Sequence, residues 1–238
     1  MEQFYIGLHQ PHDAVHFARA CISVNRLRTR RKPLTCNLLL DSGAFTELAA
    51  HGRYRTEPED YARTILRLAD IAPLDAAVTQ DWMCEPFMLA KTGKTVREHQ
   101  ALTIERYDAL RVLCPDLPLM PVLQGYAPSD YVEHIHQYGR RLGLGQWTGV
   151  GSVCKRNAHP DAVRAVLTAI TEYRPDLRLH GFGVKTTSLA DPHIRSLLWS
   201  ADSMAWSYAA RREGRGQQAN DWREAQAFLD KIENRLGG

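Results

Sequence analysis

The sequence predicts an α/β protein, a single (β/α)8 barrel of the TIM type. Two observations predict it. Short apolar runs recur along the chain, and most of them end at a polar or glycine-bearing tip and are followed by an amphipathic stretch. The length of 238 residues suits one such barrel, and 44% hydrophobic residues suffice for a buried core. An open doubly wound sheet is the main alternative.

Eight segments have the apolar character of strands that are covered on both faces. They are Phe4–Leu8, Cys21–Asn25, Asn37–Leu40, Ala76–Gln80, Leu119–Gln124, Thr148–Val153, Leu179–Val184 and Ser203–Trp206.

Helical patterns occupy most of the gaps between these strands. They cover Pro58–Ala69, Thr95–Leu113, Tyr131–Leu142, Asp161–Tyr173, Asp191–Ser200 and Asp221–Leu236, with a less regular pattern over Asp13–Ala20. Thr56 and Glu59 have the spacing of a capping box before the first helix. The polar segment Arg211–Asn220 predicts a mobile loop. Since no linker divides the chain, residues 1–238 are expected to form one domain, with the helix 221–236 packing on the barrel.

Composition excludes several classes of protein. No apolar run approaches the roughly 20 residues that span a bilayer, and the N-terminus lacks the pattern of a signal peptide. The five cysteines are widely spaced and form no zinc motif, so we expect reduced thiols, no metal and no cofactor. These features predict a cytoplasmic protein without a membrane partner.

Polar or glycine residues mark the tips of the predicted strands. Asp41, Asp81, Gln124 and Gly151 lie at or near the carboxyl ends of such strands, and Asp202 adjoins the eighth strand. Each one alone is more often structural, for example as a helix cap. Because a parallel barrel gathers the carboxyl ends of its strands on one rim, the ordered set predicts an active site there. Two carboxylates on that rim suit covalent or acid–base chemistry.

Basic residues follow three of the predicted strands. They are Arg26, Arg28, Arg30, Arg31 and Lys32 after the second strand, Lys155 and Arg156 after the sixth, and Arg211 and Arg212 after the eighth. A net charge of +3 is too small to imply nucleic acid by itself. Its concentration on the predicted active face favours contacts to the phosphates of an anionic polymer.

The ordered tips resemble those of the tRNA-guanine transglycosylase superfamily. The motifs are Asp-Ser-Gly-Ala-Phe (41–45), Asp81, Leu-Gln-Gly (123–125), Gly-Val-Gly-Ser (149–152), Gly-Phe-Gly (181–183) and Asp202. The resemblance is closest to the compact DpdA-like proteins, which are associated with 7-deazaguanine bases in DNA. His9-Gln10-Pro11 and the run 22–28 support that narrower likeness, which extends to about Arg212.

The resemblance implies a role for each matching residue. Asp202 would be the nucleophile that attacks C1′ of a guanosine, and Asp41 the general acid/base. The base would be contacted by Asp81, Gln124, Gly151, Ser152, Phe45 and His180, with His180 at a position where an apolar stacking partner is expected. The implied reaction replaces guanine with a 7-deazaguanine such as preQ0, in a bacterial or phage-encoded protein.

The chain also departs from the tRNA enzymes. Their zinc subdomain needs cysteines and a histidine after the nucleophile, and here none follows Asp202. DNA is therefore favoured over tRNA as the partner. A helper protein that opens the strands is a further candidate partner. The same exchange on tRNA, an N-glycosidase that uses water, and a non-catalytic nucleic-acid-binding subunit remain as alternatives.

Overall fold

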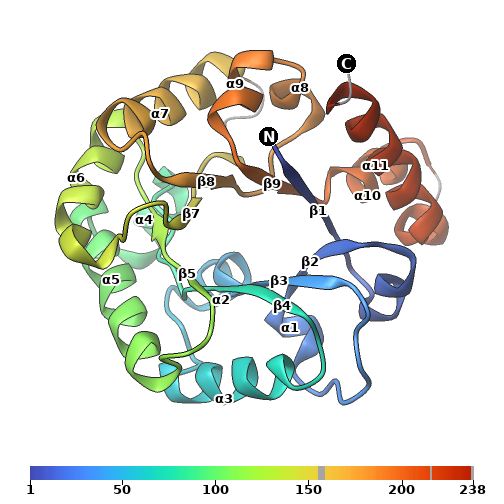
Figure 1. Ribbon diagram of the computed structural model, residues 1–238, viewed down its shortest axis with the longest axis horizontal. Coiled ribbons are helices and arrows are strands. Elements are labelled where there is room, and N and C mark those ends of the chain that lie inside the picture. The colour runs from blue at the N-terminus through green and yellow to red at the C-terminus, as the bar shows by residue number, and fades with distance from the viewer. Residues whose placement is uncertain (155–158, 215, 237–238) are drawn as a thin grey trace.

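The computed structural model describes residues 1–154, 159–214 and 216–236. Nine strands, all paired in parallel, form a ring that is surrounded by helices (Figure 1). The strands are β1 (Gln3–Gly7), β2 (Arg19–Ser23), β3 (Asn37–Asp41), β4 (Leu74–Val78), β5 (Leu119–Met120), β6 (Val122–Leu123), β7 (Trp147–Val150), β8 (Arg178–Gly181) and β9 (Ser200–Ser203). The predicted barrel is confirmed.

The nine strands correspond to eight predicted ones because Pro121 splits the fifth. The order in the sheet is β5-β4-β3-β2-β1-β9-β8-β7-β6, so β5 and β6 stand at its two ends. They are consecutive halves of one chain segment, and proline has no amide hydrogen for the ladder. The amide of Gly149 on β7 still donates to the carbonyl of Pro121 over 2.8 Å, and this contact helps to bring the ring close to closure.

Helices follow nearly every strand. They are α1 (Val24–Leu27), α2 (Ala44–His51), α3 (Pro58–Ala69), α4 (Pro86–Thr92), α5 (Val96–Leu113), α6 (Pro128–Tyr138), α7 (Pro160–Tyr173), α8 (Thr186–Leu189), α9 (Pro192–Leu197), α10 (Ala205–Arg212) and α11 (Trp222–Leu236), with 3-10 turns η1 (Pro11–His16), η2 (Gly139–Arg141) and η4 (Gly216–Asn220). Within the described ranges, no helix is both long and apolar enough to cross a membrane.

Some local predictions were wrong. The last strand ends at Ser203, and Ala205 already begins α10, so the predicted strand Ser203–Trp206 is misplaced. The segment Arg211–Asn220 is not simply a loop, because α10 continues to Arg212 and η4 begins at Gly216. The predicted capping box at Thr56 does not form, since Glu57 is the N-cap of α3 and makes no side-chain cap bond.

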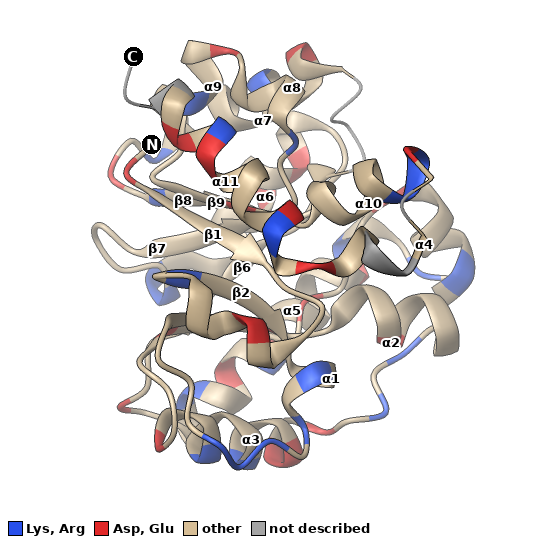
Figure 2. Cartoon of the chain, turned by 90° about the vertical axis from the view of Figure 1, so that its right-hand side faces the viewer, with Lys and Arg blue, Asp and Glu red and all other residues tan. Residues whose placement is uncertain are grey.

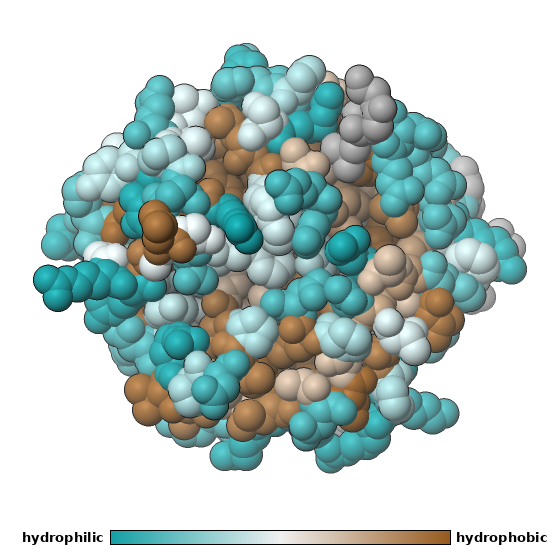
Figure 3. All heavy atoms as spheres, in the orientation of Figure 1, coloured by the Kyte–Doolittle hydropathy of each residue, from teal (hydrophilic) through white to brown (hydrophobic). Residues whose placement is uncertain are grey.

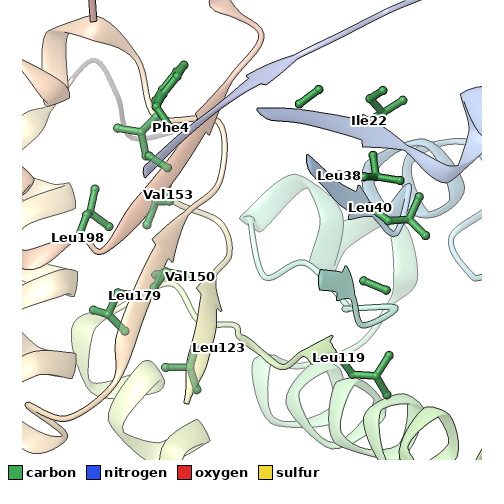
Figure 4. Packing of buried hydrophobic residues seen from close by; sticks show 14 of the residues in the cluster. Phe4, Ile22, Leu38, Leu40, Leu119, Leu123, Val150, Val153, Leu179 and Leu198 are labelled. Carbon is green, nitrogen blue, oxygen red and sulfur yellow. The ribbon is translucent and has the colours of Figure 1, made fainter. Parts of the chain in front are cut away.

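The core has two layers, and the two-residue period of the strands separates them. Outward-pointing residues such as Leu38, Leu123 and Leu179 pack between the sheet and the helices (Figure 4). A second cluster fills the barrel interior: Tyr5, Cys21, Leu39, Ala76, Val78, Met120 and Val122, with Trp147 and Phe182 against it. The inward-pointing side chains nearest the carboxyl ends of the strands therefore border the rim of the barrel.

The carboxyl ends of the strands face one side of the molecule. Figure 2 shows α1, α2, α4 and α10 on that side, with basic residues on α1 and at the end of α10. Figure 3 shows the opposite face, where hydrophilic side chains surround more apolar ones. The predicted functional residues that follow the strands therefore lie at one end of the barrel, opposite the face in Figure 3.

Candidate active site

A cavity of about 690 Å³ opens at the carboxyl ends of the strands. All of the predicted catalytic and base-contacting residues except His180 line it: Asp41, Phe45, Asp81, Gln124, Gly151, Ser152 and Asp202, together with the basic residue Arg26. They come from β3, α2 and the ends of β4, β6, β7 and β9, and α1 supplies Arg26. Sequence positions more than 150 residues apart thus meet in one cavity.

Asp202 lines this cavity, and the described residues form hydrogen bonds to one of its two carboxylate oxygens. The amide of Gly183 donates to its Oδ1 over 2.9 Å, and His180 Nε2 lies 3.3 Å from the same atom. The side chain is only 12% exposed. Both of these contacts are to Oδ1, and Oδ2 accepts no hydrogen bond from the described residues.

His180 lies beneath Asp202 and not on the cavity wall. Its ring is fully buried, and its register partner on β9 is Ser200, two residues before Asp202. The structure therefore gives no support to the expectation that His180 contacts a base. The reason is the strand period: His180 and Phe182 both point inward, and the residue nearer the rim, Phe182, lines the cavity.

A hydrogen-bonded chain sets the orientation of the His180 ring. Trp147 Nε1, which can only donate, lies 2.8 Å from Ser200 Oγ, and Ser200 Oγ lies 2.9 Å from His180 Nδ1. The hydroxyl of Ser200 can then donate to Nδ1. With this direction of the Ser200 bond, a ring hydrogen stands on Nε2, which faces Asp202.

Asp41 lies at the end of β3 and shares the cavity with Asp202. Its Oδ2 accepts a hydrogen bond of 3.1 Å from the amide of Gly43. Burial, and then the charge of Asp202, raise the pKa of Asp41 to about 6, although the bonds from Gly43 and Ser23 oppose this shift. A carboxyl group with this pKa can both donate and accept a proton near neutral pH.

Asp81, Gln124 and Ser152 form one network on the opposite wall. Ser152 Oγ accepts from the amide of Cys84 at 3.1 Å and donates to Gln124 Oε1 at 2.9 Å. Gln124 Nε2 must then donate to Asp81 Oδ2, while Ser42 Oγ donates to Asp81 Oδ1. The backbone amide of Cys84 thus fixes the orientation of the Gln124 amide through the Ser152 hydroxyl.

Asp81 titrates at a higher pH than an ordinary aspartate. Burial, followed by the charge of Asp41, raises its pKa to about 7 even though Gln124 and Ser42 donate to it. Near neutral pH it can accept hydrogen bonds as a carboxylate or donate one as an acid.

Two residues behind the wall hold Gln124. Its backbone amide donates to His134 Nδ1 over 2.8 Å, and its carbonyl accepts from Gln100 Nε2 over 2.8 Å. Burial lowers the pKa of His134 to about 3, so this histidine is neutral. At Gly151, a Cβ atom would lie 2.1 Å from Gln124 Nε2, which explains why glycine occupies this position.

Aromatic rings form two further walls. Phe45, on the first turn of α2, is 48% exposed, and Phe182 follows β8. A Cβ atom at Gly149 would lie 2.4 Å from the Phe182 ring, so this glycine makes room for it. Sequence reasoning missed Phe182, although its place two residues after an inward-pointing His180 could have indicated it.

The predicted basic residues have different surroundings. Arg26 lines the cavity, whereas Arg28 and Arg31 line a neighbouring cleft of about 650 Å³. Arg28 is held by Asn25 Oδ1 at 2.7 Å and lies 3.3 Å from Glu47. Arg30 donates to the carbonyls of Lys32 and Pro33.

The remaining basic residues lie near the end of the chain or outside the described part. Arg211 and Arg212 are exposed at the end of α10, on the same side as the cavity (Figure 2). Lys155 and Arg156 lie outside the described residues. The cavity therefore has cationic side chains near it on α1 and α10, with three carboxylates inside.

This arrangement suits displacement at an electrophilic carbon. It offers a carboxylate oxygen that accepts no hydrogen bond from the described residues, a second carboxyl that can transfer a proton, and hydrogen-bonding groups in the same cavity as two aromatic rings. A flat, polar ring fits such a space. No curated protein shows a significant match to the chain. A family model described as DpdA, DeoxyPurine in DNA protein A, matches residues 1–221, so the chain belongs to the DpdA family, as its resemblance within the transglycosylase superfamily predicted.

Proposed function

We propose that this protein exchanges guanine in DNA for a 7-deazaguanine base such as preQ0, through a covalent intermediate on Asp202. The observation that carries the proposal is the state of the two acids. Asp202 has one oxygen held by Gly183 and His180 and the other without a hydrogen bond from the described residues, and it shares the cavity with Asp41, whose pKa is raised to about 6. Family membership supports a role in the modification of purines in DNA.

In the first half of the reaction, Asp202 Oδ2 attacks C1′ of the target deoxyguanosine. The bond between C1′ and N9 breaks, and its electron pair leaves with the base. Protonated Asp41 donates its proton to the departing guanine, so that a neutral base leaves. The strand remains bound to Asp202 by an ester bond at C1′.

The second half reverses these steps with the incoming base. Asp41, now a carboxylate, removes the proton from N9 of the 7-deazaguanine. N9 then attacks C1′, and the ester bond to Asp202 breaks. Asp41 is again protonated and Asp202 is again a carboxylate, so the exchange consumes no cofactor and changes no overall charge.

The opposite wall would recognise the base. Guanine and 7-deazaguanines both carry N–H donors at N1 and N2. Ionised Asp81 can accept hydrogen bonds from these donors. The second amide hydrogen of Gln124 is available to the carbonyl oxygen at position 6. The rings of Phe45 and Phe182 would contact the two faces of the base. Because the two bases share this edge, one site can serve both halves of the exchange.

DNA is the polymer that the family indicates. The exposed arginines on α1 and α10 would contact phosphates of the strand. A base within a duplex must first leave the stack, at a cost of a few kcal/mol, before C1′ can reach Asp202. Single-stranded DNA should therefore react more readily than the same sequence in a duplex unless a helper protein opens the strands.

The test uses purified protein, labelled preQ0, and matched DNA and tRNA substrates. We expect label to enter DNA and a covalent protein–DNA adduct to survive denaturing electrophoresis. Asp202→Ala should abolish both. Label in tRNA alone would assign the exchange to RNA, and release of guanine without added preQ0 would indicate an N-glycosidase. Neither incorporation nor an adduct, on single-stranded or duplex DNA of many sequences, would reject the proposal.

A further inference from the structure

Exposed aromatic side chains gather at the end of the barrel that holds the cavity. Phe45, Phe87, Tyr126 and Tyr208 each follow the carboxyl end of a strand and are 45–58% exposed. Among the described residues, the one other large aromatic side chain with comparable exposure is Tyr173, at the end of α7.

Exposed aliphatic side chains have a different distribution. They lie late in η1, on α3, at the end of α5 and in the segment that enters β7: Val15, Leu66, Val112, Leu113 and Leu144. A surface for an apolar protein partner would be expected to mix aliphatic and aromatic residues. A rim with exposed aromatic rings is better suited to flat partners that stack, such as nucleobases.

Phe45 and Phe87 form a continuous aromatic surface. Their ring centroids lie 6.4 Å apart with an interplanar angle of 65°. Phe45 lines the cavity and Phe87 does not, so the pair leads from the cavity to the outer rim. Phe87 is 47% exposed on the first turn of α4.

The two rings stand on a rigid base. Leu48 on α2 and Met88 on α4 are fully buried and belong to one apolar cluster with Met83. Because this cluster joins α2 and α4, the positions of Phe45 and Phe87 are set relative to each other before any ligand binds. A preformed surface loses little conformational entropy on binding.

We propose that Phe87 stacks on the nucleobase next to the target guanine in the substrate strand. This inference rests on the proposed function and adds a contact outside the base-exchange cavity. When the target base leaves the stack to enter the cavity, its neighbour loses a stacking partner, and an apolar side chain on the protein can replace it. The cations near the same opening, Arg26 and the end of α10, are placed for the phosphates on either side.

The experiment measures binding in the absence of deazapurine, so that it does not depend on turnover. The probe is a single-stranded DNA oligonucleotide with one guanine, compared with two versions that carry an abasic site on the 5′ or the 3′ side of it. Phe87→Ala should weaken binding to the intact oligonucleotide by about tenfold. The loss should disappear with one of the two abasic versions, because the base that Phe87 contacts is then absent.

Two further variants separate stacking from apolar bulk. Phe87→Trp should bind as tightly as the parent, whereas Phe87→Leu should be weakened like Phe87→Ala. Tyr173→Ala, an exposed aromatic removed at the other end of the barrel, should bind normally. A Phe87→Ala loss of equal size on all three oligonucleotides, or no loss, would overturn the inference, as would failure of the parent protein to bind DNA. DNA binding without base exchange would instead reject the proposed function and leave the stacking test valid.

Discussion

Asp202 depends on neighbours that take up one of its two carboxylate oxygens. Gly183 and His180 both approach Oδ1, and the chain from Trp147 through Ser200 directs the His180 hydrogen toward it. His180 is thus a positioning residue in the proposed reaction. It fixes which oxygen of Asp202 is available.

We predict that His180→Ala lowers kcat for base exchange roughly 10- to 100-fold, the equivalent of one lost hydrogen bond to a charged group. The KM for the deazapurine should change little, because His180 does not line the cavity. His180→Gln, which can place an amide N–H near the position of Nε2, should recover part of the rate. Steady-state kinetics with thermal unfolding of both variants checks this, and equal rates for the two variants would contradict it.

The raised pKa of Asp41 predicts an unusual pH dependence of stability. An aspartate in an unfolded chain loses its proton near pH 3.9, whereas folded Asp41 keeps its proton to about pH 6. Between these values the folded state binds more protons than the unfolded state. The contribution of Asp41 to stability is therefore present below the unfolded pKa and is lost as the pH rises through about 6.

We expect Asp41→Asn to remove this loss and to raise Tm by a larger amount at about pH 8 than at about pH 5. Asp176 provides a control of opposite sign, because its hydrogen bonds to Arg174 lower its pKa to about 2. Asp176→Asn should lower Tm at both pH values. Calorimetry of the two variants makes the comparison, and a Tm gain for Asp41→Asn that shrinks as the pH rises would contradict it.

At the scale of single elements, two similar sequence patterns have different outcomes. Thr95 and Glu98 form a complete capping box at the start of α5, with Glu98 Oε2 accepting from the Thr95 amide over 2.8 Å. Thr56 and Glu59 have the same spacing, but α3 begins with Glu57 and Pro58 and the box does not form. A proline at the first helical position already supplies the required φ angle.

Thr95→Ala should therefore cost about 1 kcal/mol and lower Tm by roughly 2–4 °C. Thr56→Ala is the matched control and should change Tm less, since its hydroxyl makes only a long contact of 3.5 Å to Arg28. Thermal unfolding measures both. A larger effect at Thr56 than at Thr95 would show that the spacing, and not the formed hydrogen bonds, governs stability.

At the scale of the whole molecule, the exposed cations near the cavity should make DNA binding sensitive to salt. Each contact to a phosphate releases counterions from the DNA, so binding weakens as the salt concentration rises. Arg26→Ala should reduce the slope of log K against log salt by about 1. Arg140→Ala, on η2 before β7 and so at the other end of the barrel, should leave the slope unchanged. Titrations at several salt concentrations measure the slopes, and equal slopes for the two variants would place the DNA elsewhere.

The sequence by itself determined the barrel and the main polar residues at its rim. Apolar runs separated by amphipathic stretches report burial directly, so the helix Pro58–Ala69 and the positions of Asp41, Asp81, Gln124 and Asp202 could be predicted. The order of the motifs also indicated the family. Boundaries were harder to predict at the last strand, where the apolar run continues directly into α10.

Only the tertiary structure decided how these residues share their roles. Ser200 and His180 are paired on neighbouring strands and lie beneath Asp202, whereas Phe182 lines the cavity. His180 and Phe182 both point inward, and Phe182 lies one layer nearer the rim. The pKa values of Asp41 and Asp81 are raised because the fold buries three carboxylates together, and no local pattern encodes that distance. The sequence identified the chemical groups, and the closing of the barrel set their orientation and their charge.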